Sequence, residues 1–176
     1  MIMKHLALLL IFILFTCHST KKTNNTENAK PMINNLQCPE DGMCSLTVSK
    51  LKSLNVKSDE FGNSYTEIAD GNNTLLTFEY KRKPIENVED DNYQEFVYIE
   101  LQNPIENLTL EDNQLQDAKV TFVRLCFCKG QTGAYKVTNG KLNITKLETS
   151  SYQLELSFKV DEVPQIINTV SSEFSL

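Results

Sequence analysis

The stretch Ser151-Tyr-Gln-Leu-Glu-Leu-Ser-Phe-Lys-Val160 decides the fold class of this chain. Apolar and polar residues alternate along it, and the apolar members are Tyr152, Leu154, Leu156, Phe158 and Val160. Successive side chains of a β-strand point to opposite faces, so strict alternation is typical of a strand with one buried face. We therefore expect a strand here, with the apolar members in the core of a β domain.

The same period of two recurs on the N-terminal side of this stretch. Leu54 and Val56 follow a break in the pattern at Lys50-Leu51, which indicates a β-bulge. The remaining alternating sets are Leu46 and Val48; Leu76, Phe78 and Tyr80; Val97, Ile99 and Leu101; and Leu142 and Ile144.

One segment is apolar on both faces. Val120 to Cys128 carries large apolar residues at nearly every position, with Arg124 as the exception. Such a run is typical of a strand covered on both sides, so we expect this segment to be the central strand. Downstream, Tyr135 and Val137 lead into Asn139-Gly140, a strong signal for a two-residue hairpin turn.

Helix signals are sparse. Thr109-Leu110-Glu111-Asp112 resembles a capping box that opens a short helix towards Leu115, and Pro164 is placed to start a short C-terminal helix. The sequence thus predicts an all-β domain, an antiparallel β-sandwich or small barrel of roughly seven or eight strands with one or two short helices. The alternation does not separate the sandwich from the barrel.

The start of the chain differs from the β region. Lys4 and His5 form a short basic stretch, an unbroken apolar run extends from Leu6 to Phe15, and Cys17 follows it. A helix needs roughly 20 apolar residues to cross a bilayer, so this run is too short to span one and has the length of a signal-peptide h-region. We expect residues 1–16 to be a cleaved signal peptide.

The residues around Cys17 resemble a bacterial lipobox, in which the cysteine is lipidated and becomes the first residue of the mature protein. Thr16 stands where Gly, Ala or Ser is usual, and Phe15 is bulky; relaxed boxes of this kind are similar to those of Bacteroidota lipoproteins. The resemblance covers only the leader and implies a protein held at the cell envelope by acyl chains on Cys17. The alternative is an ordinary secretory signal cleaved near Ser19, in which Cys17 leaves with the leader.

Residues 17–36 are predicted to be a tether between the lipidated cysteine and a single β domain at 37–176. The segment is polar and rich in Asn and Thr, which is typical of disorder. A coil of this length spans about 20–25 Å. Surface-exported Bacteroidota lipoproteins tend to have acidic residues after the cysteine, whereas Lys21 and Lys22 stand here. By this resemblance we expect an outer-membrane lipoprotein that faces the periplasm.

Charge and histidine content exclude several classes of function. The chain has 17 basic and 23 acidic residues, a net charge of −6, and no basic stripe, so we exclude nucleic-acid binding. Its two histidines are His5 in the leader and His18 in the tether. Triad catalysis and histidine-containing metal sites need an imidazole in the folded part, unless a partner supplies it. We expect no enzyme activity, no metal and no cofactor.

The β region contains four cysteines, Cys38, Cys44, Cys126 and Cys128. An even number in an exported chain favours disulfides. In a regular strand the Cα atoms of Cys126 and Cys128 would lie about 6.5–7 Å apart, at or beyond the limit for a bond between them. We therefore expect each of these two to pair with one of Cys38 and Cys44.

Two other arrangements of the cysteines stay open. A four-cysteine zinc site would use the same residues, although structural zinc ligands usually come in pairs with two to four residues between them, and here five and one intervene. In a redox-active arrangement, Cys38 and Cys44 close their own loop, while Cys126 and Cys128 form an exposed dithiol with Lys129 as a basic neighbour.

Charged residues gather on one predicted connection between strands. It is either a solvated loop or a docking loop for a protein partner, because loops on a rigid β scaffold often carry binding residues. The docking candidates are Lys81, Arg82, Lys83, Glu89, Asp90 and Asp91.

The expected function is that of a non-catalytic accessory or interaction subunit of an envelope assembly, with acyl chains as the membrane contact and an envelope protein as the partner. Two alternatives stay open. One is a carrier for a small apolar ligand with a barrel cavity. The other is a thiol–disulfide redox protein.

Overall fold

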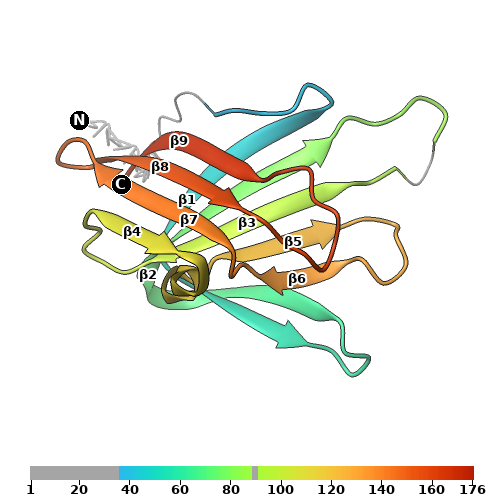
Figure 1. The fold of residues 1–176 in the computed structure, drawn as a ribbon, viewed down its shortest axis with the longest axis horizontal. Coiled ribbons are helices and arrows are strands. Elements are labelled where there is room, and N and C mark those ends of the chain that lie inside the picture. Colours follow the sequence, from blue (N-terminus) through green and yellow to red (C-terminus); the bar gives the residue numbers. More distant parts are fainter. Residues whose placement is uncertain (1–35, 89–90) are drawn as a thin grey trace, which may run out of the picture.

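The computed structural model describes residues 36–88 and 91–176, which form two antiparallel sheets packed face to face (Figure 1). The first sheet has the order β1 (Gly42–Ser58), β2 (Ser64–Arg82), β3 (Gln94–Leu101), β5 (Thr121–Leu125), β6 (Gly133–Lys136). The second has the order β4 (Leu108–Glu111), β7 (Gly140–Lys146), β8 (Ser151–Phe158), β9 (Thr169–Ser175). The all-β prediction is confirmed. The architecture is a sandwich, and the described residues form nine strands where about seven or eight were expected.

The main core lies between the two sheets. In β8 the side chains of Tyr152, Leu154, Leu156 and Phe158 are buried, as their alternation predicts. The largest wholly buried side chains opposite them in β2 and β5 are Phe78, Tyr80 and Phe122. Each such side chain stabilises the fold by about 1.5–3 kcal/mol relative to exposure. The apolar side chains of the alternating strands thus form one core that both sheets share.

One short helix, the 3₁₀ helix η1 (Asp112–Ala118), follows β4. Its capping box is formed by Glu111 and Gln114, two residues later than the Thr109 box that the sequence predicts. At its end Lys119 adopts the left-handed conformation with φ 43° and turns the chain towards β5.

The predicted helix after Pro164 is absent, and this prediction is wrong. Residues 161–168 form bends and irregular chain that lead into β9. The side chain of Gln165 donates hydrogen bonds to the carbonyl oxygens of Phe158 and Ile167 and accepts one from the amide of Val160. Of these groups, the Ile167 carbonyl oxygen is one that a helix starting at Pro164 would use within itself. The contacts to Phe158 and Val160 tie Gln165 back to the end of β8 instead.

Asn139-Gly140 does not close a hairpin, which corrects the second local prediction. β6 pairs with β5, whereas β7 pairs with β4 and β8, so the chain crosses from one sheet to the other at this point. A Cβ atom on Gly140 would lie 2.2 Å from the carbonyl oxygen of Ser157. Glycine is therefore needed here for the close approach to β8.

The segment Val120 to Cys128 is also not the central strand. β5 ends at Leu125 and lies between β3 and β6, so β3 is the middle strand of its sheet. The residues that follow β5 leave the sheet, and Phe127 is 90% exposed. An apolar run indicates a strand buried on both faces only if the whole run is in the strand. Here the strand ends at Leu125, and the last residues of the run are in a surface loop.

The hairpin of β1 and β2 is much longer than the strands beside it. The register of the pair shifts between Lys50 and Lys52, which confirms the predicted bulge, and Leu51 there has φ 55°. Only Thr74 to Lys81 of β2 pairs with β3. Among the described strands, the part of the hairpin from Lys52 to Asp70, here called the ribbon, pairs only with itself.

The ribbon lies beside β6, as Figure 1 shows for the teal end of the hairpin. The hydroxyl of Ser64 donates to the carbonyl oxygen of Ala134 and accepts from its amide, at 2.7 and 3.0 Å. Beneath the ribbon a second small core forms on the outer face of the five-stranded sheet. Its buried members are Leu54, Leu75, Tyr98, Val123 and Ala134.

The predicted signal peptide, residues 1–16 with Cys17 beyond it, lies outside the described residues, as does the tether up to Asn35. No helix within 36–88 and 91–176 has the length and apolar character that crossing a bilayer requires.

Candidate binding cleft

A cleft of about 630 Å³ opens where the ribbon meets the outer face of the five-stranded sheet. The ribbon contributes Tyr65 and Thr66 to its lining, and the loop between β5 and β6 contributes Gly130 and Thr132. Cavities of about 300–1,000 Å³ are the size range of ligand sites. The cleft is thus large enough for a small molecule or for a few side chains of a partner.

The sheet side of the cleft is aromatic and apolar. Phe96 and Tyr98 lie on the outer face of β3 and stack with centroids 6.1 Å apart and planes 15° from parallel. Val123 and Leu125 of β5 continue this surface. Burial raises the pKa of Tyr98 above its usual value of 10.0, so its hydroxyl stays neutral at physiological pH.

The ribbon ends in a turn that presents Phe61 to solvent. The Asp59 carboxylate accepts hydrogen bonds from the amides of Phe61 and Asn63 and from the side chain of Asn63, at 2.8–2.9 Å. Gly62, at φ 83°, completes the turn. Phe61 is 81% exposed although the turn beneath it is fully hydrogen-bonded. An apolar ring is therefore held in water on an ordered support.

A second exposed ring belongs to the disulfide loop (residues 126–132), which contributes Gly130 and Thr132 to the cleft. Cys126 and Cys128 are bonded to each other, with Cα atoms 5.2 Å apart. The hydroxyl of Thr132 donates to the carbonyl oxygen of Cys126 at 2.8 Å. Phe127 lies between the two cysteines and is 90% exposed. Covalent and hydrogen bonds thus fix this loop as well.

The cleft is electrically neutral apart from one carboxylate. Among the described residues that line the cleft, Asp59 is the one with a charged side chain. Its hydrogen bonds with Asn63, Phe61 and Gly62 lower the pKa of Asp59 below the usual 3.8, and they also occupy its oxygens. A charged ligand would find no free counter-charge here, so the cleft suits a neutral, largely apolar occupant.

Glu100 holds the ribbon in place. This buried carboxylate accepts hydrogen bonds from the amide of Leu54 and the side chain of Asn73, both at 2.6 Å, and from Lys119 at 3.0 Å. Burial alone would raise the pKa of Glu100, but these hydrogen bonds and the Lys119 charge outweigh it and hold the pKa below 4.5. The Glu100 carboxylate on β3 thus joins the ribbon and the end of η1 to the sheet through hydrogen bonds.

A buried polar network anchors the disulfide loop from the other side. Arg124 donates from Nη1 to the side-chain oxygen of Gln131 at 2.7 Å and from Nε to the hydroxyl of Tyr93 at 3.1 Å. Tyr93 donates to Glu95, which is wholly buried. Both Glu95 oxygens also accept amide hydrogen bonds, from Ile166 and Ile167, at 2.7 Å.

The cysteine pairing differs from the expected one. Cys38 bonds to Cys44, and Cys126 bonds to Cys128. The prediction that each of Cys126 and Cys128 pairs with a cysteine of the N-terminal segment is therefore wrong. It assumed a regular strand, but β5 ends at Leu125, and the bend that follows brings the two Cα atoms within bonding range.

The basic residues predicted for docking are partly engaged in the fold. The Arg82 guanidinium lies 4.3 Å from the centre of the Tyr93 ring. The ammonium of Lys83 donates to the carbonyl oxygen of Glu40 at 2.7 Å. The Lys83 contact joins the end of β2 to the loop closed by Cys38 and Cys44, and the Arg82 contact joins it to the residue before β3, whereas Lys81 is exposed.

The acidic half of that predicted cluster is only partly described. Asp91 accepts a hydrogen bond from the amide of Ile85 at 3.1 Å, within the connection between β2 and β3. Glu89 and Asp90 lie outside the described residues. The structure gives Arg82, Lys83 and Asp91 contacts within the fold, and docking by this cluster stays a prediction.

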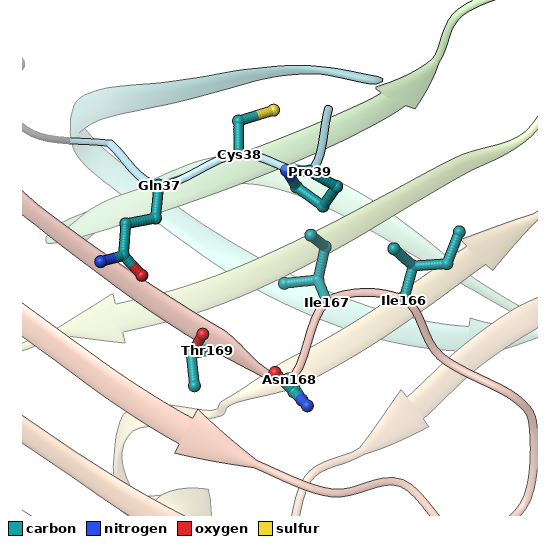
Figure 2. Close-up of a pocket in the computed structure, with 7 residues that line it drawn as sticks. All are labelled: Gln37, Cys38, Pro39, Ile166, Ile167, Asn168 and Thr169. Carbon is teal, nitrogen blue, oxygen red and sulfur yellow. The ribbon is translucent and has the colours of Figure 1, made fainter. Parts of the chain in front are cut away.

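A smaller pocket of about 250 Å³ lies between the N-terminal segment and the start of β9 (Figure 2). Pro39 lies over Ile166 and Ile167 in this view, and the sulfur of Cys38 points away from them. None of its lining residues is aromatic or charged. The cleft, with its aromatic surface and greater volume, is the better candidate for a binding site.

Comparison with known protein families, curated proteins and solved structures finds no match for this chain. The candidate site therefore rests on geometry alone. Within the part of the chain that the structure describes, no three His, Cys, Asp or Glu side chains come together as a metal site would require.

Sequence reasoning did not find the cleft. Phe96 and Tyr98 alternate with Val97 and Ile99, so β3 is apolar on both faces, and this was the one available signal. A strand that is apolar on both faces needs a second covering layer, which here is the ribbon.

Proposed function

We propose that this protein is a non-catalytic interaction domain that binds an apolar segment of an envelope protein in the cleft. The observation that carries the proposal is the gathering of exposed apolar side chains around one opening. Phe61 and Phe127 are exposed on two hydrogen-bonded turns, and residues of both turns, such as Asn63 and Thr132, line an aromatic cleft. Large exposed apolar side chains that gather at one place mark interaction sites rather than isolated surface residues.

The ribbon and the disulfide loop hold most of the large apolar side chains that the described residues expose. These are Leu51 at the start of the ribbon, Val56, Phe61, Tyr65 and Ile68 within it, and Leu125 and Phe127 at the loop. Exposed aromatic anchors beside a pocket are typical of the residues that dominate protein interfaces. A lining whose one charged side chain, Asp59, already accepts hydrogen bonds from its own turn further favours an apolar partner over a charged one.

The anchoring part of the proposal rests on the leader. Lipidation of Cys17 would hold the domain at the outer membrane, on its periplasmic side, through acyl chains and the tether. Intact mass of protein purified from membranes measures this directly. We expect a chain that begins at Cys17 and carries a diacyl or triacyl group, and an unlipidated chain would contradict the anchor.

The binding site is tested by stoichiometric capture from detergent-solubilised membranes. The probe variant is Phe61→Ser with Phe127→Ser, and the matched control is Ile85→Ser with Met43→Ser, two apolar residues that are also exposed but lie away from the cleft. We expect a partner that is retained by the wild type and by the control and lost by the probe variant. Equal retention by both variants, or recovery of the domain alone, would contradict the proposal.

The second candidate is a carrier for a small apolar ligand, which the cleft volume of about 630 Å³ favours. The core between the sheets is filled with side chains, so such a ligand would occupy the cleft rather than a barrel interior. Native mass spectrometry after gentle purification distinguishes the two candidates. A bound small molecule that Tyr98→Ala releases would support the carrier, and a ligand-free mass would oppose it.

A further inference from the structure

We propose that the Cys126–Cys128 disulfide is a thiol–disulfide exchange site, and that its substrate is a polypeptide dithiol whose neighbouring residues are apolar. The substrate class rests on the cleft that is proposed above as the binding site. The exchange chemistry itself does not depend on that proposal.

The disulfide is partly exposed in a loop that adjoins the cleft, although Cys126 also packs against the core between the sheets and neither cysteine lines the cleft. Both cysteines are partly exposed and lie in the loop just after the end of β5. Leu125, before them, and Thr132, after them, line the cleft. Phe127 between them is 90% exposed, so an apolar segment that contacts this ring lies beside the residues that carry the two sulfur atoms. A binding surface and a reactive bond thus share one loop.

The charge around this disulfide favours exchange. A thiolate is both the attacking and the leaving group in the reaction, so basic neighbours promote it and acidic neighbours oppose it. Residues 124–133 include Arg124 and Lys129 and no acidic residue, although the whole chain has a net charge of −6. The loop closed by Cys38–Cys44, in contrast, contains Glu40 and Asp41. The chain therefore carries its own comparison disulfide, whose loop contains two carboxylates with Arg82 and Lys83 close to them.

Thr132 distinguishes the two sulfur atoms of the exchange site. Its Oγ1 lies 3.8 Å from the Sγ of Cys126, and the amide of Cys126 donates to it at 3.4 Å. By rotating from the Cys126 carbonyl oxygen to the sulfur, this hydroxyl would donate a hydrogen bond to a Cys126 thiolate. We therefore assign Cys126 as the leaving sulfur and Cys128, next to Lys129, as the sulfur that is attacked.

The reaction balances with the substrate as the only co-reactant. A substrate thiolate attacks the Sγ of Cys128, the Cys126–Cys128 bond breaks, and its electron pair leaves on Cys126. The second substrate thiolate then attacks the substrate sulfur of the mixed disulfide and releases Cys128. The substrate dithiol is oxidised to a disulfide, the protein disulfide is reduced to a dithiol, and the two substrate protons end on Cys126 and Cys128.

The test uses the oxidised full-length protein with three reductants: dithiothreitol, a synthetic peptide dithiol flanked by Leu and Phe, and the same peptide flanked by Ser and Asn. Acid quenching, alkylation and peptide mass analysis give the rate at which each disulfide opens. We expect Cys126–Cys128 to open about tenfold faster than Cys38–Cys44 with dithiothreitol, and about tenfold faster with the apolar peptide than with the polar one.

Two variants make the result decisive. Phe127→Ser should remove the preference for the apolar peptide, so that the apolar and the polar peptide open Cys126–Cys128 at the same rate. Lys129→Glu should slow the opening of Cys126–Cys128 and leave Cys38–Cys44 unaffected. If Cys38–Cys44 opens as fast as Cys126–Cys128 with dithiothreitol, the exchange site is overturned. If Cys126–Cys128 opens first but both peptides open it at the same rate, the proposed apolar substrate class is overturned. Partner binding at the cleft is tested separately, by the capture experiment above.

Discussion

The Glu100 carboxylate accepts a hydrogen bond from the main-chain amide of Leu54 at 2.6 Å, across 46 residues of sequence. This contact joins the middle strand of the larger sheet to the first residues of the ribbon. It fixes the ribbon just beyond the bulge at Leu51, where the hairpin leaves the sheet. The cleft exists because the ribbon is held over the sheet at this point.

Replacing Glu100 by Gln should loosen the ribbon. The amide keeps the size of the side chain but brings its own N–H donors towards the amide of Leu54 and the side chains of Asn73 and Lys119, which are all donors. We expect a loss of about 1–3 kcal/mol in the free energy of unfolding, and faster amide hydrogen exchange within Lys52–Asp70 than in β8. The measurements are denaturant unfolding and exchange mass spectrometry.

The matched control for this variant is Glu67→Gln, which removes an exposed partner of Lys57 on the same ribbon. An exposed ion pair contributes little, so a change within about 0.5 kcal/mol is expected. Equal destabilisation by the two variants would show that Glu100 has no special role in holding the ribbon.

We expect protonation of Glu100 to contribute to the loss of stability at low pH. Its pKa is lower in the folded protein than the usual 4.5, so the unfolded chain binds this proton more readily. The contribution of Glu100 to stability is therefore complete above pH 4.5 and is lost as pH falls through the folded-state pKa. Unfolding curves of the wild type and Glu100→Gln should converge as the pH falls below 4.5. If the difference in free energy of unfolding between the wild type and Glu100→Gln stays constant with pH, the pH dependence does not come from Glu100.

How far the sequence predicts this structure depends on how local each signal is. The alternation in β8 and the break at Lys50-Leu51 are local and were interpreted correctly. The prediction of a hairpin at Asn139-Gly140 was wrong because contacts with β8 determine whether the chain turns back or crosses to the other sheet at this point. The cysteine pairing failed because it assumed that β5 continued past Leu125.

The cleft was beyond local reasoning for a related physical reason. It depends on Leu54, Val123 and Ala134 meeting under the ribbon, and these residues are far apart in the sequence. A long hairpin can lie flat as an extension of its sheet or bend over it. The left-handed conformation of Leu51 and the contacts of buried Glu100 favour bending. The break in the sequence pattern indicates the bulge at Leu51 but not the direction of the bend, and no pattern indicates the contacts of Glu100.

Tyr93 should ionise only at unusually high pH. Burial and its hydrogen bond to Glu95 raise the pKa of Tyr93 from 10.0 to about 12. A raised folded-state pKa contributes stability that is complete below pH 10 and is lost as the pH rises towards 12. The difference in tyrosinate absorbance between the wild type and Tyr93→Phe should therefore develop near pH 12 in the folded protein. A difference that develops near pH 10 would show that Tyr93 is not buried as described.

Gly140→Ala should be among the most destabilising single-methyl changes in the chain. A Cβ atom at this position would lie 2.2 Å from the carbonyl oxygen of Ser157 and 2.7 Å from the Cα atom of Phe158, and both are main-chain atoms that move only with β8. The φ angle of 146° is also one that L residues rarely adopt. We expect a loss of about 3 kcal/mol in the free energy of unfolding.

Gly62→Ala separates the two causes. Gly62 also has a positive φ, 83°, but a Cβ atom there would meet nothing within 4 Å. Its cost should be the conformational strain alone, about 1 kcal/mol. Denaturant unfolding of both variants measures the difference, which is the cost of the contact with β8. Equal losses would mean that β8 yields to the added methyl group, and the crossing between the sheets at Gly140 would then not depend on a close approach.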